Sequence, residues 1–279
     1  MISTLQAKGF KAVPYLETSL LMASHPKGLK FSRSKPNVIV GPNGAGKSAL
    51  LSALALQTLS FFTGESSFDD NFVIGGDSDT YWGKVGASWS REYEYLPGLT
   101  CTTDNAPALY YRPGHIPGNE CTITHAMMTG YFNEARAHAD LVKAKSSGQQ
   151  SQALLQKLQT ALAGDPASVK FRHVNWRAGK APKVLDNRHH CDFEYRAEVL
   201  KKRYPLDSPD AMPVLLLDEP EQSLDAKAEV LLWKQIEAVD NAQVQVIVAT
   251  HSLYPLMHPK SFNLIEAVPG YVEQVQALI

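Results

Sequence analysis

Short apolar runs separated by glycine, proline and polar residues recur along the chain, and they predict alternating strands and helices. Continuous apolar segments at 37–40, 213–217 and 244–249 are typical of strands that are buried on both faces. Helical spacing follows two of these segments, at 49–56 and 226–239. Strands that alternate with helices in this way predict an α/β fold with a central, mostly parallel sheet.

Two regions outside this pattern carry shorter, alternating patches. The segments 2–10, 16–22 and 29–31 are expected to be short strands of an N-terminal antiparallel layer. Residues 61–119 are rich in Gly, Ser, Asp and aromatic residues and are expected to add strands to the same layer, and 108–112 is a further candidate strand. The predicted architecture therefore combines an antiparallel layer with the parallel sheet.

The middle of the chain turns helical. Apolar positions spaced by three and four predict a helix over 124–145, and a second helix is expected over 153–162. Residues 120–165 are therefore expected to form a small helical lobe inserted into the core. The tail is expected to supply two more short strands, around 263–267 and 271–275.

Length and composition limit the possible classes of protein. The 279 residues can form one large α/β core with a small inserted lobe, so a single domain is expected over 1–279. The net charge of −1 provides no general attraction to nucleic acid, and three separated cysteines suit a reducing compartment. No signal-peptide pattern and no apolar run of membrane-spanning length is present, which predicts a cytoplasmic protein without membrane insertion.

The strongest chemical signal is the run G-P-N-G-A-G-K-S at 41–48, which has the G-x-x-x-x-G-K-S pattern of a phosphate-binding loop between a strand and a helix. Glycines let the backbone N–H groups approach phosphates closely, Lys47 adds a positive charge, and the Ser48 hydroxyl is a ligand for Mg²⁺. The expected nucleotide-binding residues are Asn43, Gly44, Ala45, Gly46, Lys47, Ser48 and Ala49.

Two further strands are expected to bring polar side chains to the same edge of the sheet. Asp218 and Glu219 follow one buried strand, and ligands of open α/β sheets bind at the carboxyl ends of the strands. We expect Asp218 to hold Mg²⁺ opposite Ser48, and Glu219 to polarise the attacking water. His251 follows the next strand and is expected to contact the γ-phosphate or that water, with a solvated loop position as its alternative.

Three aromatic residues near the N-terminus, Phe10, Tyr15 and Phe31, are candidates to stack on an adenine ring. Each can instead be an ordinary core residue, because large aromatic side chains are commonly buried. The sequence does not choose among them.

Together these motifs resemble the ABC-type ATPase fold, specifically its non-transporter branch of RecF-, SMC- and OLD-like proteins, over roughly 2–60 and 205–265. In this resemblance 41–48 matches the Walker A motif, and 215–219 matches the Walker B motif with its catalytic glutamate. The other similar segments are L-Q-A-K-G-F-K-A at 5–12 (opening strand), P-E-Q-S-L-D at 220–225 (D-loop, with Ser223 and Asp225), T-H-S at 250–252 (His switch) and S-S-G-Q-Q at 146–150 (signature motif, with Ser147 and Gly148).

The resemblance implies a function as well as a fold. In this family Mg²⁺ and ATP lie between two subunits, with Walker A from one subunit and the signature motif from the other. ATP binding closes the dimer and hydrolysis opens it, which is a population shift driven by contacts made only in the closed state. The expected protein is an ATP-gated homodimer with ATPase activity that acts on DNA or on a separately encoded effector, in DNA maintenance or anti-phage defence.

The chain departs from the family pattern in two places. About fifty residues lie between the end of the helix that follows the signature-like segment, expected over 153–162, and Walker B; they include 167–210, which is interpreted as an insertion, and the alternative is that the assignment of Ser147 is wrong. No glutamine occurs from Thr58 to Gly148, where the family places one in a loop that contacts Mg²⁺ and water. This absence predicts either slow hydrolysis or another side chain that contacts Mg²⁺ and water in place of the glutamine.

The insertion is basic. Residues 170–203 contain ten basic and four acidic side chains, a net charge of +6, and include Trp176, Phe193 and Tyr195. Such a segment can bind nucleic-acid phosphates and stack on bases, and a solvated surface insertion is an equal alternative. The run H-H-C at 189–191 could supply metal ligands, but no second ligand pair lies at a suitable spacing, which disfavours a metal site.

Three other classes of protein are less consistent with the sequence. The nucleotide-binding subunit of a membrane transporter would carry its signature motif directly before Walker B and would have the missing glutamine. An ATP-dependent assembly or regulatory module with little hydrolysis would not need Glu219. A guanine-specific switch would carry the Asn/Thr-Lys-x-Asp motif that reads the base, and the chain lacks it.

Overall fold

The computed structural model describes residues 1–10, 13–57, 98–104, 108–111, 162, 214–222 and 224–279, which form two sheets and the helices around them. The smaller sheet is antiparallel and has the order β2-β1-β4. Its strands are β1 (Ile2–Ala7), β2 (Leu29–Lys30) and β4 (Leu99–Thr103). The expected N-terminal antiparallel layer is therefore present, and β4 comes from the region expected to extend it.

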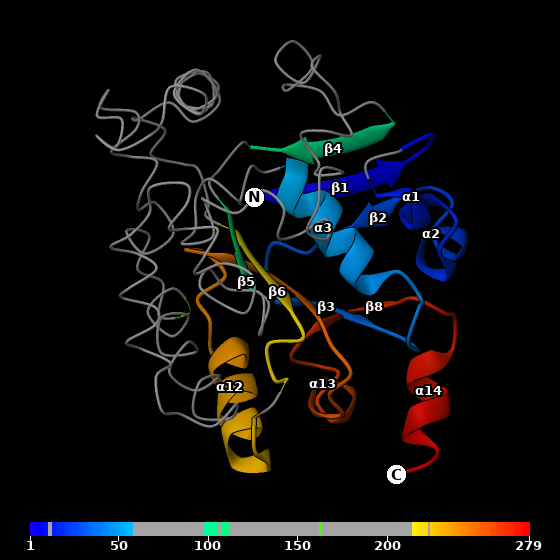
Figure 1. The fold of residues 1–279 in the computed structure, drawn as a ribbon. Helices are drawn as coiled ribbons and strands as arrows, with labels where there is room; N and C mark the ends of the chain where they lie inside the picture. The colour runs from blue at the N-terminus through cyan, green and yellow to red at the C-terminus, as the bar shows by residue number, and fades with distance from the viewer. Residues whose placement is uncertain (11–12, 58–97, 105–107, 112–161, 163–213, 223) are drawn as a thin grey trace, which may run out of the picture.

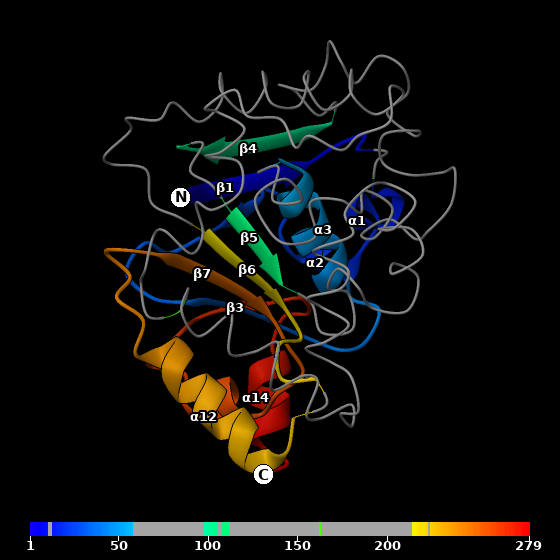
Figure 2. The same ribbon diagram turned by 60° about the vertical axis from the view of Figure 1, so that its left-hand side comes forward.

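The larger sheet is the core of the fold, and every neighbouring pair of its strands is parallel. The strand order is β5-β6-β7-β3-β8, so the strand expected to carry the histidine, β7, lies between the phosphate-loop strand β3 and the strand expected to carry the acids, β6 (Figure 2). The strands are β3 (Asn37–Val40), β5 (Ala108–Tyr111), β6 (Val214–Asp218), β7 (Gln245–Ala249) and β8 (Asn263–Glu266).

Side chains of β3, β6 and β7 are buried on both faces, as their continuous apolar sequences predict. One face packs on a helix, α3 (Lys47–Gln57), that contacts β5, β6 and β7. On the other face lies α12 (Ala226–Glu237), together with α13 (Tyr254–Met257) and α14 (Tyr271–Gln276) (Figure 1). The strand–helix alternation expected from the sequence is thus confirmed for these elements.

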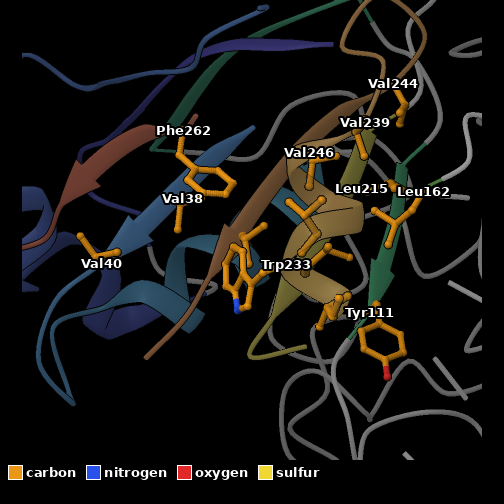
Figure 3. Packing of buried hydrophobic residues seen from close by; sticks show 14 of the residues in the cluster. Val38, Val40, Tyr111, Leu162, Leu215, Trp233, Val239, Val244, Val246 and Phe262 are labelled. Carbon is orange, nitrogen blue, oxygen red and sulfur yellow. The ribbon is translucent and has the colours of Figure 1, made fainter. Parts of the chain in front are cut away.

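Trp233 of α12 is the largest fully buried side chain of this core. Its ring stacks on Tyr254, with ring centroids 6.1 Å apart, and meets Phe262 edge-on at 5.7 Å. Around it, Val38 and Val246 come from the facing sheet (Figure 3). This aromatic cluster fixes α12 and the start of α13 against the sheet, and so fixes the loops that precede both helices.

Buried amide side chains join the two sheets. Gln245, at the start of β7, donates from Nε2 to the Ile2 carbonyl at 2.8 Å and accepts from the Ile2 N–H at 2.7 Å. Asn37 accepts the Ser32 N–H at 2.6 Å and donates to the Val246 carbonyl at 3.3 Å. Gln245 therefore joins β7 to β1 of the antiparallel sheet, and Asn37 fixes the segment that follows β2 to the amino ends of β3 and β7.

Two expected strands are helices. Residues 16–22 fall in α1 (Pro14–Glu17) and α2 (Leu20–Ser24), because Pro14 opens the first helix and the Ser19 hydroxyl caps the second by accepting the Met22 N–H. Residues 271–275 form α14, which follows Gly270 at φ 76° and buries Val272. The expected strand at 108–112 exists as β5, and it joins the parallel sheet.

Several predicted regions lie outside the described residues. They include the helical lobe at 120–165 apart from Leu162, the basic insertion at 167–210, and the candidate strands between 58 and 97. Their structure therefore stays a prediction. Among the residues that the structure describes, none of the helices has both the length and the apolar character that crossing a bilayer demands.

Candidate functional site

The phosphate loop connects β3 to α3 and depends on two glycines that touch neighbouring elements. A Cβ on Gly46, at φ 99°, would lie 2.4 Å from the Ser19 Cβ, and a Cβ on Gly41 would lie 2.6 Å from the Ala267 Cβ. Neither approach leaves room for a side chain. Asn43 and Gly44 at the top of the loop are exposed, which leaves this part of the backbone free to contact a ligand.

Lys47, the first residue of α3, is turned back over its own loop. Its Nζ donates to the carbonyls of Gly41 at 2.9 Å and Pro42 at 3.0 Å, and lies 3.0 Å from His251 Nε2. The side chain is buried, and burial lowers the pKa of Lys47 below its ordinary value, with the carboxylates of Glu219 and Asp218 opposing that shift. The result is a cation held at the mouth of the phosphate loop.

Ser48 and Asp218 bring the next pair of polar groups together. The Ser48 hydroxyl donates to Asp218 Oδ1 at 2.8 Å, and Asp218 ends β6 with no exposed surface. A hydroxyl and a carboxylate are the hard oxygen ligands that Mg²⁺ takes in nucleotide sites. These two residues from separate elements therefore fit a magnesium ion, as the sequence predicts.

Glu219 leaves the strand with a backbone conformation that is rare for a residue with a side chain. Its φ is 48°, and no other non-glycine residue in the described part of the chain has a positive φ. Its N–H donates to the Ala249 carbonyl at 2.8 Å, so the turn is fixed to the end of β7. Such a conformation costs about 1 kcal/mol or more, and is commonly kept at functional sites. The turn places Glu219 Oε1 3.5 Å from His251 Nε2.

His251 lies between Lys47 and Glu219 at the end of β7. Burial, followed by the positive charge of Lys47, lowers the pKa of His251, and the carboxylates of Glu219 and Asp218 oppose this. An ammonium group has only donors, so Nε2 must accept from Lys47 and the ring proton belongs on Nδ1. The imidazole therefore accepts as a neutral ring and lies between Lys47 Nζ and Glu219 Oε1, while 36% of its side-chain surface stays exposed.

A second carboxyl group holds the loop that carries His251. Glu221 Oε1 accepts the Thr250 hydroxyl in a short hydrogen bond and accepts the His251 N–H at 3.3 Å. Thr250 Oγ1 in turn accepts the Ser252 N–H at 2.8 Å. This role of Glu221 was not predicted from the sequence, where the residue falls only within the D-loop-like segment, because a glutamate in a loop carries no spacing signal.

The remaining predicted site residues divide into described and undescribed groups. Asp225 caps α12, because its Oδ1 accepts the Ala228 N–H at 2.8 Å. Ala45 and Ala49 are buried beneath the phosphate loop. Ser147, Gly148 and Ser223 lie outside the described residues.

Among the three candidate aromatics, exposure separates one from the others. Phe10 and Phe31 are buried in the core, with 3% and 6% of their surface exposed, whereas Tyr15 is 70% exposed. Tyr15 lies on α1, and the following helix contacts the phosphate loop through the Leu21 N–H, which donates to the Ala45 carbonyl at 3.0 Å. Tyr15 is therefore the candidate that is free to meet a ligand.

A protein-family model described as "AAA domain, putative AbiEii toxin, Type IV TA system" matches residues 198–256. This segment contains Asp218, Glu219 and His251, and it is less than half of the chain. The match supports an AAA- or ABC-like P-loop ATPase at a coarse level, together with ATP binding. No curated protein matches the chain.

Proposed function

We propose that the protein binds Mg-ATP and hydrolyses it to ADP and phosphate, as an ABC-type ATPase of the non-transporter branch. One observation carries the proposal. The ends of β3, β6 and β7 bring together a lysine, a hydroxyl, two carboxylates and a neutral imidazole, with neighbouring polar atoms 2.8–3.5 Å apart. This edge of a parallel sheet is where α/β proteins bind their ligands.

Each side chain has a distinct role in this reaction. The exposed loop backbone and Lys47 bind the phosphates, and the phosphate oxygens compete with the Gly41 and Pro42 carbonyls for the ammonium group. Ser48 and Asp218 hold Mg²⁺, which neutralises charge on the phosphates when it is bound. Tyr15 offers an exposed ring to the adenine.

Glu219 accepts a proton from the attacking water, and His251 lies beside it. We assign the base to Glu219 because its carboxylate directly follows the proposed magnesium ligand Asp218 at the end of β6, whereas Nε2 of His251 is held by Lys47. When Lys47 binds phosphate, Nε2 of His251 loses its lysine donor and becomes available to the γ-phosphate or the water. The pair thus supplies a base and a neighbouring polar group.

Phosphate release from Mg-ATP by the purified wild-type protein tests this function. We expect turnover that stops when EDTA removes Mg²⁺ and that is absent in Lys47→Ala, the matched preparation control. GTP at equal concentration should be a poorer substrate, because no guanine-reading motif is present. Equal phosphate release by wild type and Lys47→Ala would contradict the proposal.

The resemblance extends the proposal to an ATP-gated homodimer, in which Ser147 and Gly148 of one subunit contact the ATP of the other. The mass in solution of Glu219→Gln, with and without Mg-ATP, tests this assembly. We expect a monomer without nucleotide and a dimer with it, and Ser147→Arg should abolish the shift because a long side chain replaces a small one at the contact. A shift that is indifferent to Ser147→Arg would refute the assignment of the signature motif.

Such a switch would act on a separately encoded effector or on DNA. The corresponding process is DNA maintenance or anti-phage defence. The toxin–antitoxin wording of the matching family model favours defence. The basic segment 170–203 is the candidate contact with nucleic acid or with the partner, and the cytoplasm is the proposed location. A transporter subunit and an assembly module with little hydrolysis remain the alternatives; the Glu219–His251 pair disfavours the module.

A further inference from the structure

Glu221 makes contacts that its position in the chain does not require. It lies two residues after Glu219, in the loop between β6 and α12, and its side chain reaches across to the loop after β7. There Oε1 accepts two donors, the Thr250 hydroxyl and the His251 N–H. One oxygen atom therefore joins the loop that carries Glu219 to the backbone that carries His251.

The same carboxyl group lowers the stability of the folded protein. Glu221 Oε2 is buried and has no hydrogen-bond partner among the described residues, and burial raises the pKa of Glu221 above its ordinary value while the Thr250 hydrogen bond opposes the shift. A buried, half-satisfied carboxyl group destabilises a protein relative to an apolar side chain of the same size. Stability alone therefore does not explain a glutamate at this position.

Its geometry offers a better explanation. Thr250 is buried with 1% of its surface exposed, and its hydroxyl is fully used, donating to Glu221 and accepting from the Ser252 N–H. The backbone that bears the His251 ring is thereby held on both sides of its Cα. The ring needs such support because it must stay near two different groups, Lys47 Nζ at 3.0 Å and Glu219 Oε1 at 3.5 Å.

We propose that Glu221 is a positioning residue of the ATPase site, whose Oε1 holds the Thr250–His251 backbone so that the imidazole stays between Lys47 and Glu219. The proposal rests on the hydrolytic function proposed above. Glu221 acts through its hydrogen-bond acceptor: among the described residues it makes no hydrogen bond to the Mg²⁺ ligands or to the phosphate loop, and its charge adds only the smallest of the three carboxylate effects that raise the pKa of Lys47. Its effect therefore appears in turnover and not in nucleotide affinity.

The chain offers a matched control that supports the same loop from α12. Glu229, in the first turn of α12, accepts the Ser252 hydroxyl at 2.6 Å, and Ser252 Oγ accepts the Tyr254 N–H at 3.1 Å. This second carboxyl group also fixes the loop after β7, one residue beyond His251. Its hydrogen bond goes to Ser252 and not to His251, so its loss should loosen the loop without releasing the histidine.

The test compares Glu221→Leu, Glu221→Gln and Glu229→Leu in steady-state phosphate release and in the affinity for a fluorescent ATP analogue. We expect Glu221→Leu to lower kcat by about tenfold or more, since a displacement of about 1 Å can cost up to about 10²-fold, with KM and affinity within about twofold of wild type. Glu221→Gln keeps an acceptor oxygen and should restore most of kcat. Glu229→Leu should stay within about twofold in both parameters.

A double-mutant comparison decides whether Glu221 acts through His251. In the His251→Ala background, Glu221→Leu should cause no further loss of kcat, because the group it positions is already absent. Equal losses in both backgrounds would overturn the proposal. Thermal unfolding of every variant is measured alongside, and if Glu221→Leu does not fold, Thr250→Val removes one of the two donors and should lower kcat several-fold.

A measurement that does not depend on turnover distinguishes failure of this proposal from failure of the proposed ATPase function. If wild type releases no more phosphate than Lys47→Ala, the proposed function fails, and the imidazole NMR signals of His251 then test Glu221 without turnover. Positioning predicts that Glu221→Leu shifts or broadens these signals and that Glu229→Leu leaves them unchanged. Signals that are the same in wild type and Glu221→Leu would refute it.

Discussion

The loop after β3 and the loops after β6 and β7 meet at one edge of the sheet, but they are held by different means. The phosphate loop is held by its backbone, with Gly41 and Gly46 pressed against Ala267 and Ser19. The other two loops are held by side-chain carboxyl groups, through Glu221 and Glu229. A loop that offers backbone N–H groups to a ligand must keep its side chains out of the way, whereas loops that present side chains can use neighbouring ones as supports.

The largest effect should come from the point where the two kinds of loop touch, the Ser48–Asp218 contact. Asp218→Asn keeps the shape but removes the charge that attracts Mg²⁺, so we expect turnover to fall by about 10²-fold or more and the Mg²⁺ concentration for half-maximal rate to rise. Phosphate release across a Mg²⁺ titration measures both. An unchanged Mg²⁺ dependence would mean that Asp218 does not contact the metal.

This difference between the loops also decides what the sequence could predict. The phosphate loop was recognisable because its function restricts residue type at fixed spacings, and glycine and lysine cannot be exchanged there. Asp218, Glu219 and His251 were predicted as site residues because they lie at the end of a buried strand or within two residues of it. Glu221 was missed, because its partner Thr250 is close in space but far in sequence, and neither residue type is unusual in a loop.

The fold shows the same division. Strands buried on both faces were predicted from continuous apolar runs, because burial on both faces leaves no polar positions. The segments 16–22 and 271–275 were mistaken for strands because short apolar runs fit either structure, and the deciding features were local. In the first segment the Ser19 cap favours a helix, and in the second the side chain of Val272 packs into the core.

A second, smaller effect tests whether the backbone of the phosphate loop is tightly constrained. Gly46→Ala places a Cβ 2.4 Å from Ser19 at a positive φ, and we expect a loss of about 2–3 kcal/mol in the free energy of unfolding. Gly44→Ala is the control, because its φ of 72° carries strain but a Cβ there meets nothing within 4 Å, so about 1 kcal/mol is expected. Urea unfolding of both variants measures the difference, and equal losses would contradict the close packing.

A third prediction concerns the side-chain supports beyond the site. Asp225→Ala removes the N-cap of α12 and should cost about 1 kcal/mol in the free energy of unfolding, and Asp225→Asn should recover most of it because the amide oxygen still accepts the Ala228 N–H. Denaturant unfolding gives both values. If the loss in Asp225→Ala is not recovered in Asp225→Asn, the role of Asp225 is not that of a cap.

The smallest effect is a pH dependence of stability due to Glu221. Its pKa is raised in the folded state by burial, so the folded protein binds the proton more tightly than the unfolded chain. The stabilising contribution is fully present below the ordinary value of 4.5 and is lost as the pH rises through the raised pKa. Relative to wild type, Glu221→Gln should therefore gain stability as the pH rises through that interval, and the negative charge of nearby Glu229 acts in the same direction.

Thermal unfolding of wild type and Glu221→Gln from pH 4 to pH 8 tests this prediction. Taking the difference in stability between the two proteins at each pH removes the contributions that other titratable groups make to both. A difference that is constant across the whole range would show that Glu221 titrates as it does in the unfolded chain. A difference of the opposite sign would show that the folded state favours the charged carboxylate.

The most direct test of the whole account is made on Glu219→Gln, by measuring Mg-ATP affinity and phosphate release on the same preparation. We expect an affinity close to that of wild type, because Glu219 contacts His251 and acts on the phosphate loop only through its charge, and a turnover lower by about 10²-fold or more, because the base is lost. Full turnover in Glu219→Gln would contradict the account, since the strained residue at the end of β6 would then have no part in hydrolysis.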